Sequence, residues 1–366
     1  MNGDKSAHQC VANQQTDSHL SPAIAVSSKH DDWQRAGHQA AQRLPTPAVI
    51  ASLAAFQTES ESMAPLMIWQ LLHELSFVSA EGWLISDARQ RAGIADCFQF
   101  LLEKWHGILE DEGIVEQREQ RWFAGDCAPS LPTIEQRIDD GKIRLRRCLD
   151  WHLEGDDFLD TLFADQHTLC EVMRYPQLAQ SRLSLHESCP LDPAMHQRSM
   201  LVDYLGQIAA SLLQTAVQGS DSQQVLEINA NTGHSDLHPL RDVQNFPAAQ
   251  FDAVLAINVL HTTHRLDGIL QDIWHALKPE GVMIVVEPTQ DSSPRWITAA
   301  AVLQQATKEH NSQFTLSLSR EAWQQAFMRN VFHLVGDWPQ PGTALAFAGY
   351  RVFMMRRSAS VMDIET

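Results

Sequence analysis

The sequence predicts an α/β protein in which a shortened, doubly wound parallel sheet follows a helical N-terminal domain. In the C-terminal half, short apolar segments with strand character alternate with segments of helical periodicity, as in successive β-α-β units. In the N-terminal half, apolar residues recur mainly at three- and four-residue steps, which indicates helices. The expected strands of the sheet are residues 225–228, 251–258 and 282–287, and the expected helices beside them are 197–216 and 266–277.

We divide the chain into three parts. Residues 1–44 are rich in Gln, Ser, His, Asp and Ala and have little periodic apolar content, so they are expected to form a flexible tail. Residues 45–190 then form the helical domain, and residues 191–366 form the α/β core.

The helical domain carries an amphipathic helix that runs from about Ile94 to Leu109, with Gly113 as its expected stop. Residues 113–123 then predict two short strands around a polar turn, which gives this domain a winged-helix outline. Further helices are expected between residues 131 and 186, including 143–153 and 158–173.

The C-terminal end of the chain predicts a helix at residues 320–329, followed by strands at 332–335 and 350–355. These two strands suit an antiparallel hairpin that closes the sheet. The strand at 225–228 is expected near the opposite edge, where the N-terminal helices, the segment around Leu240 or a partner must cover it.

Charge and hydropathy exclude several classes of function. The formal net charge of -18 repels phosphate backbones, so nucleic acid is not expected as a partner. The densest basic run, residues 142–147, is interpreted as a solvated helix face. The longest apolar runs, at 253–257 and 281–286, are far shorter than a membrane-spanning helix needs, so no membrane association is expected.

The cysteines indicate a reducing compartment. All six stand singly, without a Cys-x-x-Cys pair, and no secretory apolar region is found at the N-terminus. We therefore expect a cytoplasmic location and buried, reduced thiols. No metal site is expected either, because Pro239 directly after His234 and His238 disfavours the helix that would place both imidazoles on one face.

Three segments of the core carry a family resemblance. They read Phe-Asp-Ala-Val-Leu-Ala-Ile-Asn-Val-Leu-His-Thr-Thr at 251–263, Leu-Lys-Pro-Glu-Gly at 277–281 and Ile-Val-Val-Glu at 284–287. Together they resemble the carbon-methyltransferase domain of polyketide and nonribosomal peptide synthases. Residues 101–114 are similar to the helical lid of those domains, so that the resemblance covers about residues 60–356. It implies a Rossmann-like class I methyltransferase core with an N-terminal lid.

The resemblance also implies a chemistry. Domains of this family methylate carrier-bound β-ketoacyl thioesters at the α-carbon with S-adenosylmethionine, and a histidine paired with a glutamate removes the α-proton. These two residues correspond to His261 and Glu287. Both stand at or just beyond the carboxyl ends of expected strands, where open α/β sheets place ligands. Asn258 ends its strand and is expected to hold substrate or cofactor. In the alternative reading, His261 only caps a strand end and Glu287 only binds a backbone amide.

The cofactor loop departs from the family pattern, which is acidic-x-Gly-x-Gly-x-Gly. Glu227 supplies the acidic residue, but Asn229 and Asn231 replace the first two glycines and only Gly233 remains. Asparagine tolerates the left-handed backbone that such a turn requires. Its side chain, however, occupies space that the cofactor needs.

The spacing behind this loop points to a missing segment. Only 17 residues separate Gly233 from Phe251. This is too few for the helices and strands that carry the ribose-binding acid, because one crossover needs about a dozen residues or more. Asp242 is left as one adenine-side contact. We therefore expect no bound cofactor.

The sequence leads to one main hypothesis and two alternatives. The main hypothesis is a pseudo-methyltransferase of polyketide or nonribosomal peptide biosynthesis, which acts on or holds an acyl thioester on an acyl carrier protein or a polyketide synthase module. The retained pair allows enolisation, dehydration or cyclisation without methyl transfer. The alternatives are a non-catalytic scaffold of the assembly line and an active methyltransferase that binds S-adenosylmethionine in a remodelled site.

Overall fold

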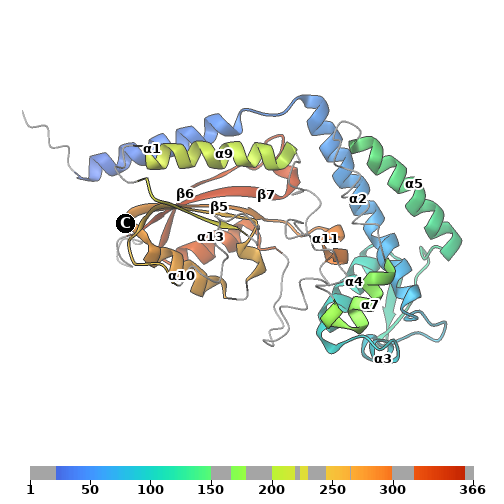
Figure 1. Cartoon of the computed structure of the whole chain (residues 1–366). Coiled ribbons are helices and arrows are strands. Elements are labelled where there is room, and N and C mark those ends of the chain that lie inside the picture. The colour runs from blue at the N-terminus through green and yellow to red at the C-terminus, as the bar shows by residue number, and fades with distance from the viewer. Residues whose placement is uncertain are drawn as a thin grey trace, which may run out of the picture.

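A computed structural model describes residues 22–149, 166–178, 200–218, 223–229, 245–263, 265–298 and 317–358. It has two parts, a sheet with helices on both faces and a helical region beside it (Figure 1). The α/β class with a helical N-terminal region is therefore confirmed.

The five strands of the main sheet are ordered β3-β4-β5-β7-β6. β3, β4 and β5 are parallel, and β7 runs antiparallel to both of its neighbours, so the predicted closing hairpin is confirmed. The central strands are apolar over most of their length because parallel strands are covered on both faces. The strands are β3 (Val225–Asn229), β4 (Phe251–Ile257), β5 (Leu277–Pro288), β6 (Phe332–Trp338) and β7 (Tyr350–Arg357).

Helices cover both faces of the sheet (Figure 1). Side chains of β5 alternate between the two layers, so that Ile284 packs with one hydrophobic cluster and Val285 with the other. The first cluster includes residues of α1 (Pro22–Ala41) and α9 (Met200–Val217). The second includes residues of α10 (Leu266–Ala276) and α13 (Arg320–Arg329).

α9 is the one helix in the described ranges that is long and apolar enough to cross a membrane by length and composition alone, with a mean hydropathy of 1.2 over 18 residues. Its side chains Leu205, Ile208 and Leu212 are buried in the cluster that covers the sheet. This packing is that of a core helix in a folded domain.

The prediction of a flexible tail over residues 1–44 is wrong from residue 22 onward, because α1 packs on the sheet layer. Trp33 is buried, and the Gln34 side chain donates a hydrogen bond to the backbone oxygen of Val335 in β6. A Cβ at Gly37 would lie 2.4 Å from the Trp338 ring, so only glycine allows this close approach. Small residues and one tryptophan of α1 make its contact with the sheet layer. A sequence pattern based on Leu, Ile and Val at helical spacing does not detect such a helix.

The helical region, called the lid below, is built around the long helix α2 (Pro47–Glu74). The predicted strand pair is confirmed as β1 (Val115–Arg118) and β2 (Arg121–Ala124), joined at Glu119 and Gln120, which both have positive φ. Gly113 has φ +66 and ends the preceding helix as predicted. The other lid helices are α3 (Ile85–Arg91), the 3-10 turn Asp96–Phe98, α4 (Gln99–Asp111), α5 (Leu131–Leu149), α7 (Gln166–Arg174) and the 3-10 turn Pro176–Leu178.

The lid and the sheet share a junction. Ile50 and Leu53, near the start of α2, pack with the sheet cluster, whereas the second half of α2 belongs to the lid core. In the other direction, α11 (Ser293–Thr298) follows β5 and inserts Trp296 into the lid core. The Trp105 indole N–H donates a 2.9 Å hydrogen bond to the Trp296 backbone oxygen.

β3 is at one edge of the sheet as described, which agrees with the sequence prediction. The expectation that N-terminal helices cover this edge is wrong for α1, which lies against β6 at the opposite edge. The segment around Leu240 lies outside the described residues.

Candidate functional site

The site is built at the carboxyl ends of β4 and β5, two neighbouring parallel strands in the interior of the sheet. Glu287 is the penultimate residue of β5, and His261 stands on the 3-10 turn Leu260–Thr262 that follows β4. His261 Nδ1 lies 2.7 Å from Glu287 Oε2. The structure thus places these two side chains in hydrogen-bond contact.

The pair is nearly removed from solvent. The Glu287 side chain is fully buried, and the His261 side chain is 8% exposed. A hydrogen bond between such groups is stronger than one in water, because the surrounding dielectric is low.

The second carboxylate oxygen of Glu287 is held by the backbone. Oε1 accepts hydrogen bonds from the N–H of Val259 at 2.8 Å and of Leu260 at 2.6 Å. Oε1 therefore accepts two hydrogen bonds, which fix the orientation of the Glu287 carboxyl group. The binding of a backbone amide, which the sequence offered as the alternative to a His–Glu pair, thus occurs together with the pair.

These contacts define the tautomer of His261. A carboxylate oxygen can only accept, so with Glu287 as a carboxylate the 2.7 Å contact assigns the hydrogen to Nδ1 of His261. Nε2 then keeps its lone pair, and no described residue forms a hydrogen bond with it. An imidazole in this state, oriented by a carboxylate, is able to act as a general base.

Asn258 lies directly after β4. Its N–H donates to the Val286 backbone oxygen at 2.7 Å, and its φ is +50. Its side-chain oxygen Oδ1 is buried and has no hydrogen-bond partner among the described residues. A buried acceptor without a partner is costly unless a ligand or water satisfies it, so this atom is a candidate ligand contact.

The described part of the chain holds little of the predicted cofactor site. Glu227 lies within β3 and is half-buried, and Asn229 is the last residue of that strand. Asn231, Gly233 and Asp242 lie outside the described residues.

The sheet order allows a test of whether S-adenosylmethionine fits. In doubly wound sheets, the acid that binds the ribose follows the second strand, which lies beyond the first strand. Here β3 is the edge strand in the described ranges, and it pairs directly with β4. The described residues therefore do not provide the ribose half of such a site. They also contain no group of three or more His, Cys, Asp or Glu side chains suited to a metal ion.

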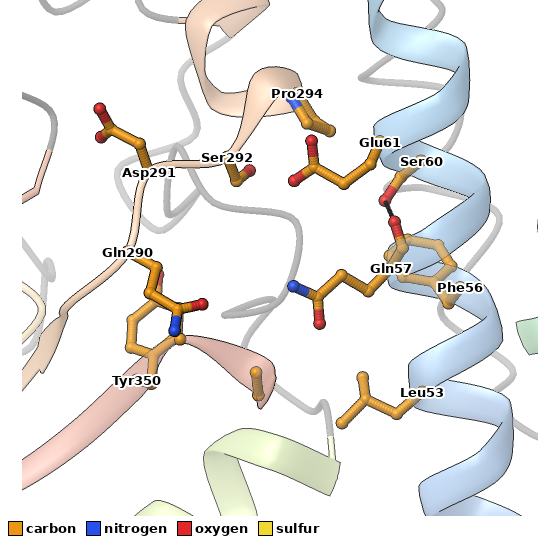
Figure 2. Close-up of a pocket in the computed structure, with 12 residues that line it drawn as sticks. Leu53, Phe56, Gln57, Ser60, Glu61, Gln290, Asp291, Ser292, Pro294 and Tyr350 are labelled. Carbon is orange, nitrogen blue, oxygen red and sulfur yellow. Dashed lines mark hydrogen bonds between the residues drawn. The ribbon is translucent and has the colours of Figure 1, made fainter. Parts of the chain in front are cut away.

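A polar cleft between lid and sheet was not predicted from the sequence. Figure 2 shows Gln57 and Glu61 on α2 pointing into the space that faces Gln290 and Ser292, on the connection between β5 and α11. The hollow is narrow, about 40 Å³. A run of polar residues at 57–62, inside an otherwise apolar helix, is the signal that would have found it.

A second, wider hollow adjoins the first and shares Glu61, Asp291 and Ser292 with it. Its volume is about 590 Å³, within the range of small-molecule sites. Lys104 contributes to its wall, and its ammonium group lies 5.7 Å from the centre of the Trp296 ring. The junction between lid and sheet is thus hollow as well as polar.

The fold and the buried His–Glu pair define the class as a class I methyltransferase-like α/β protein with a helical lid. A family model described as a methyltransferase domain matches residues 144–333, and the chain belongs to that family.

Parts of the sequence are also similar to polyketide synthases. Lovastatin diketide synthase mokB of Monascus pilosus is 34% identical over 92 residues, which cover 25% of this chain and 4% of the synthase. Squalestatin tetraketide synthase of a Phoma species is 26% identical over 100 residues, which cover 25% of this chain and 4% of the synthase. The chain thus matches only a small part of these relatives.

Solved structures show the fold over nearly the whole chain. The CurJ carbon methyltransferase has a TM-score of 0.69 and 18% identity, with 90% of this chain and 99% of that chain covered. The carbon-methyltransferase domain of the citrinin polyketide synthase has a TM-score of 0.64 and 11% identity, with 93% and 99% covered. The trans-methyltransferase CalH, solved with SAH, has a TM-score of 0.51 and 13% identity, with 82% and 91% covered. The predicted resemblance to polyketide carbon-methyltransferase domains is confirmed.

Proposed function

We propose that this chain acts on a β-ketoacyl thioester carried by an acyl carrier protein, and that His261 removes the α-proton of the acyl group. The observation that carries the proposal is the 2.7 Å contact between His261 Nδ1 and Glu287 Oε2, which leaves Nε2 as the base. Similarity to polyketide synthases supports the class of substrate. A cytoplasmic location and a polyketide synthase module as partner are part of the proposal.

The chemistry follows from the substrate and the pair. A hydrogen between two carbonyl groups is acidic, because the electron pair of the broken C–H bond spreads into an enolate. Nε2 takes this proton, and the buried carboxylate of Glu287 stabilises the resulting imidazolium. The Asn258 amide holds the substrate, with Oδ1 available as an acceptor. Transfer of the proton from Nε2 to the enolate oxygen completes an enolisation. For cyclisation, the α-carbon of the enolate attacks a carbonyl further along the acyl chain, and the oxygen of that carbonyl takes the proton from Nε2. Loss of the hydroxyl group formed in this way, together with a remaining α-proton, releases water and gives dehydration.

We propose further that the domain is a pseudo-methyltransferase. The support is the length of the connection between β3 and β4, because its 21 residues (230–250) are too few for two further strands and their helices. Isothermal titration with S-adenosylmethionine decides this point. Binding at micromolar concentration would overturn the pseudo-methyltransferase proposal and favour an active methyltransferase with a remodelled site.

Hydrogen exchange at the α-carbon tests the acid–base role. A β-ketoacyl thioester on a carrier protein is incubated in D₂O with the chain, and deuterium uptake is followed by mass spectrometry. We expect His261→Ala and Glu287→Gln to lower the exchange rate about 100-fold or more, the usual contribution of a general base. His275→Ala is the matched control, because His275 is exposed on α10. Exchange no faster than background with the unaltered chain would favour a non-catalytic scaffold.

A further inference from the structure

The path of the chain after β4 is unusual at one residue. Asn258 has φ +50, a left-handed conformation that non-glycine residues rarely adopt. Its N–H still forms the last bond of the ladder with Val286. The next two N–H groups, of Val259 and Leu260, both point at Glu287 Oε1.

The left-handed residue gives this convergence its direction. The Asn258 N–H points to β5, the conformation of Asn258 turns the Val259 N–H to the same side, and the conformation of Val259 keeps the Leu260 N–H there. In an extended strand, successive N–H groups point to opposite sides, so that two neighbours cannot donate to the same atom. A left-handed residue followed by a right-handed one turns successive N–H groups to the same side and forms a concave anion site. Val259, with φ -132 and ψ -33, is the second member of such a pair.

The anion in this concave site is a side chain of the protein itself. Because Oε1 of Glu287 is held by two backbone donors, the carboxylate cannot rotate freely, and Oε2 stays at 2.7 Å from His261 Nδ1. The Asn258 side chain forms no hydrogen bond with the pair, and its Oδ1 is without a partner among the described residues. What the residue supplies to the His–Glu pair is therefore its backbone conformation.

We infer that Asn258 is a positioning residue, whose left-handed backbone fixes Glu287 and through it the tautomer of His261. Asparagine is among the non-glycine residues that tolerate this conformation best. Glycine adopts it without strain, and a β-branched residue is strongly disfavoured there. The inference rests on the proposed function only for its kinetic test.

The decisive comparison is between Asn258→Gly and Asn258→Val. The glycine variant removes the side chain and keeps the backbone conformation, whereas the valine variant opposes that conformation. Asn258→Ala is the third variant, and it takes the place of the valine variant in the comparison if that variant does not fold. It disfavours the left-handed conformation about tenfold without adding a branched side chain.

The first readout is the NMR signal of the His261 Nδ1–H proton in 15N-histidine-labelled protein, assigned by its loss in His261→Ala. A strong hydrogen bond to a buried carboxylate protects this proton from exchange with water and moves its resonance downfield. We expect the signal to remain in Asn258→Gly and to be lost or moved upfield in Asn258→Val and Asn258→Ala. The same downfield signal in Asn258→Ala as in the unaltered chain would overturn the inference.

The second readout is the α-deuterium exchange rate. We expect kcat for exchange to fall about tenfold or more in Asn258→Val relative to Asn258→Gly, with KM unchanged between these two variants. Equal kcat values in the glycine and valine variants would contradict the inference. If the unaltered chain gives the downfield Nδ1–H signal but no α-deuterium exchange of the substrate, the proposed function is refuted. The NMR comparison of the variants would still decide the role of Asn258.

Discussion

Protonation of one buried histidine in the lid is expected to control stability at mildly acidic pH. His106 is fully buried on α4. The Trp83 indole N–H donates to His106 Nε2 at 2.8 Å, and His106 Nδ1 bonds the Leu102 backbone oxygen at 2.7 Å. Both ring nitrogens are thus satisfied in the neutral form. A proton added at Nε2 would face the Trp83 N–H, another donor.

The size of the effect follows from the pKa of His106. Burial lowers this pKa from 6.5 to about 4, with a smaller opposing contribution from the bond to Leu102. In the unfolded chain the pKa is the ordinary value. The difference of about 2.5 pKa units corresponds to roughly 3 kcal/mol of unfolding free energy.

The sign of the pH dependence is set by the depressed pKa. Above about pH 6.5 the histidine is neutral in both states, and the whole contribution to stability is present. Between 6.5 and about 4 the unfolded chain takes up a proton that the folded chain does not, so the free energy of unfolding falls by about 1.4 kcal/mol per pH unit. Below about 4 both states are protonated and this contribution stays lost.

Urea unfolding followed by tryptophan fluorescence measures this dependence at several values between about pH 7.5 and 4.5. His106→Gln is the comparison, because glutamine offers both an acceptor and a donor and does not titrate in this range. We expect the variant to be less stable than the unaltered chain at neutral pH and to lose less stability on acidification. All other titrating groups are shared, so equal slopes for the two proteins would refute the reasoning.

Two further predictions concern packing and thiol reactivity. Gly37→Ala is expected to destabilise the protein by about 1–3 kcal/mol in urea unfolding, because its Cβ would lie 2.4 Å from the Trp338 ring. The matched variant Gly206→Ala is expected to stabilise the protein by up to about 1 kcal/mol, because nothing lies within 4 Å of a Cβ at this position and alanine favours helix. A Gly37→Ala variant as stable as Gly206→Ala would contradict the packing of α1 against Trp338. Burial raises the pKa of the Cys170 thiol to about 12, so at pH 8 iodoacetamide should label exposed Cys127 well before Cys170; mass spectrometry that found Cys170 labelled first would refute this.

The parts of the fold that the sequence predicted are those that hydrophobic pattern determines. Strands β4 and β5 are buried on both faces, so their apolar runs were easily recognised. Helix α1 was missed because its contacts depend on shape. Gly37 permits the close approach of Trp338, and Trp33 supplies the bulk, and neither belongs to a periodic stripe.

The candidate site shows the same division. His261 and Glu287 were predicted from the family resemblance, and their positions at or just beyond the ends of two recognisable strands agreed with it. The two backbone hydrogen bonds to Glu287 could not be predicted from the sequence. They depend on the positive φ of Asn258, and asparagine permits a positive φ without requiring it. The lid–sheet cleft was missed for a related reason. Its polar residues come from α2 and from the segment after β5, more than 200 residues apart in sequence.

The position of the His–Glu pair in the sheet explains how acid–base chemistry can be independent of a complete cofactor site. Glu287 lies in β5 and His261 lies on the turn that follows β4, and each of these strands has a neighbour on both sides. The ribose-binding part of a doubly wound site belongs to strands beyond β3, on the far side from β5. Because β4 and β5 each pair with a described strand on both sides, their pairing does not depend on any strand beyond β3. β5 is tied further to the lid, because the chain runs from Glu287 into α11 and the Trp296 side chain in the lid core. The contact between His261 and Glu287 is therefore held by the interior of the sheet and by the lid, and not by the sheet edge at β3.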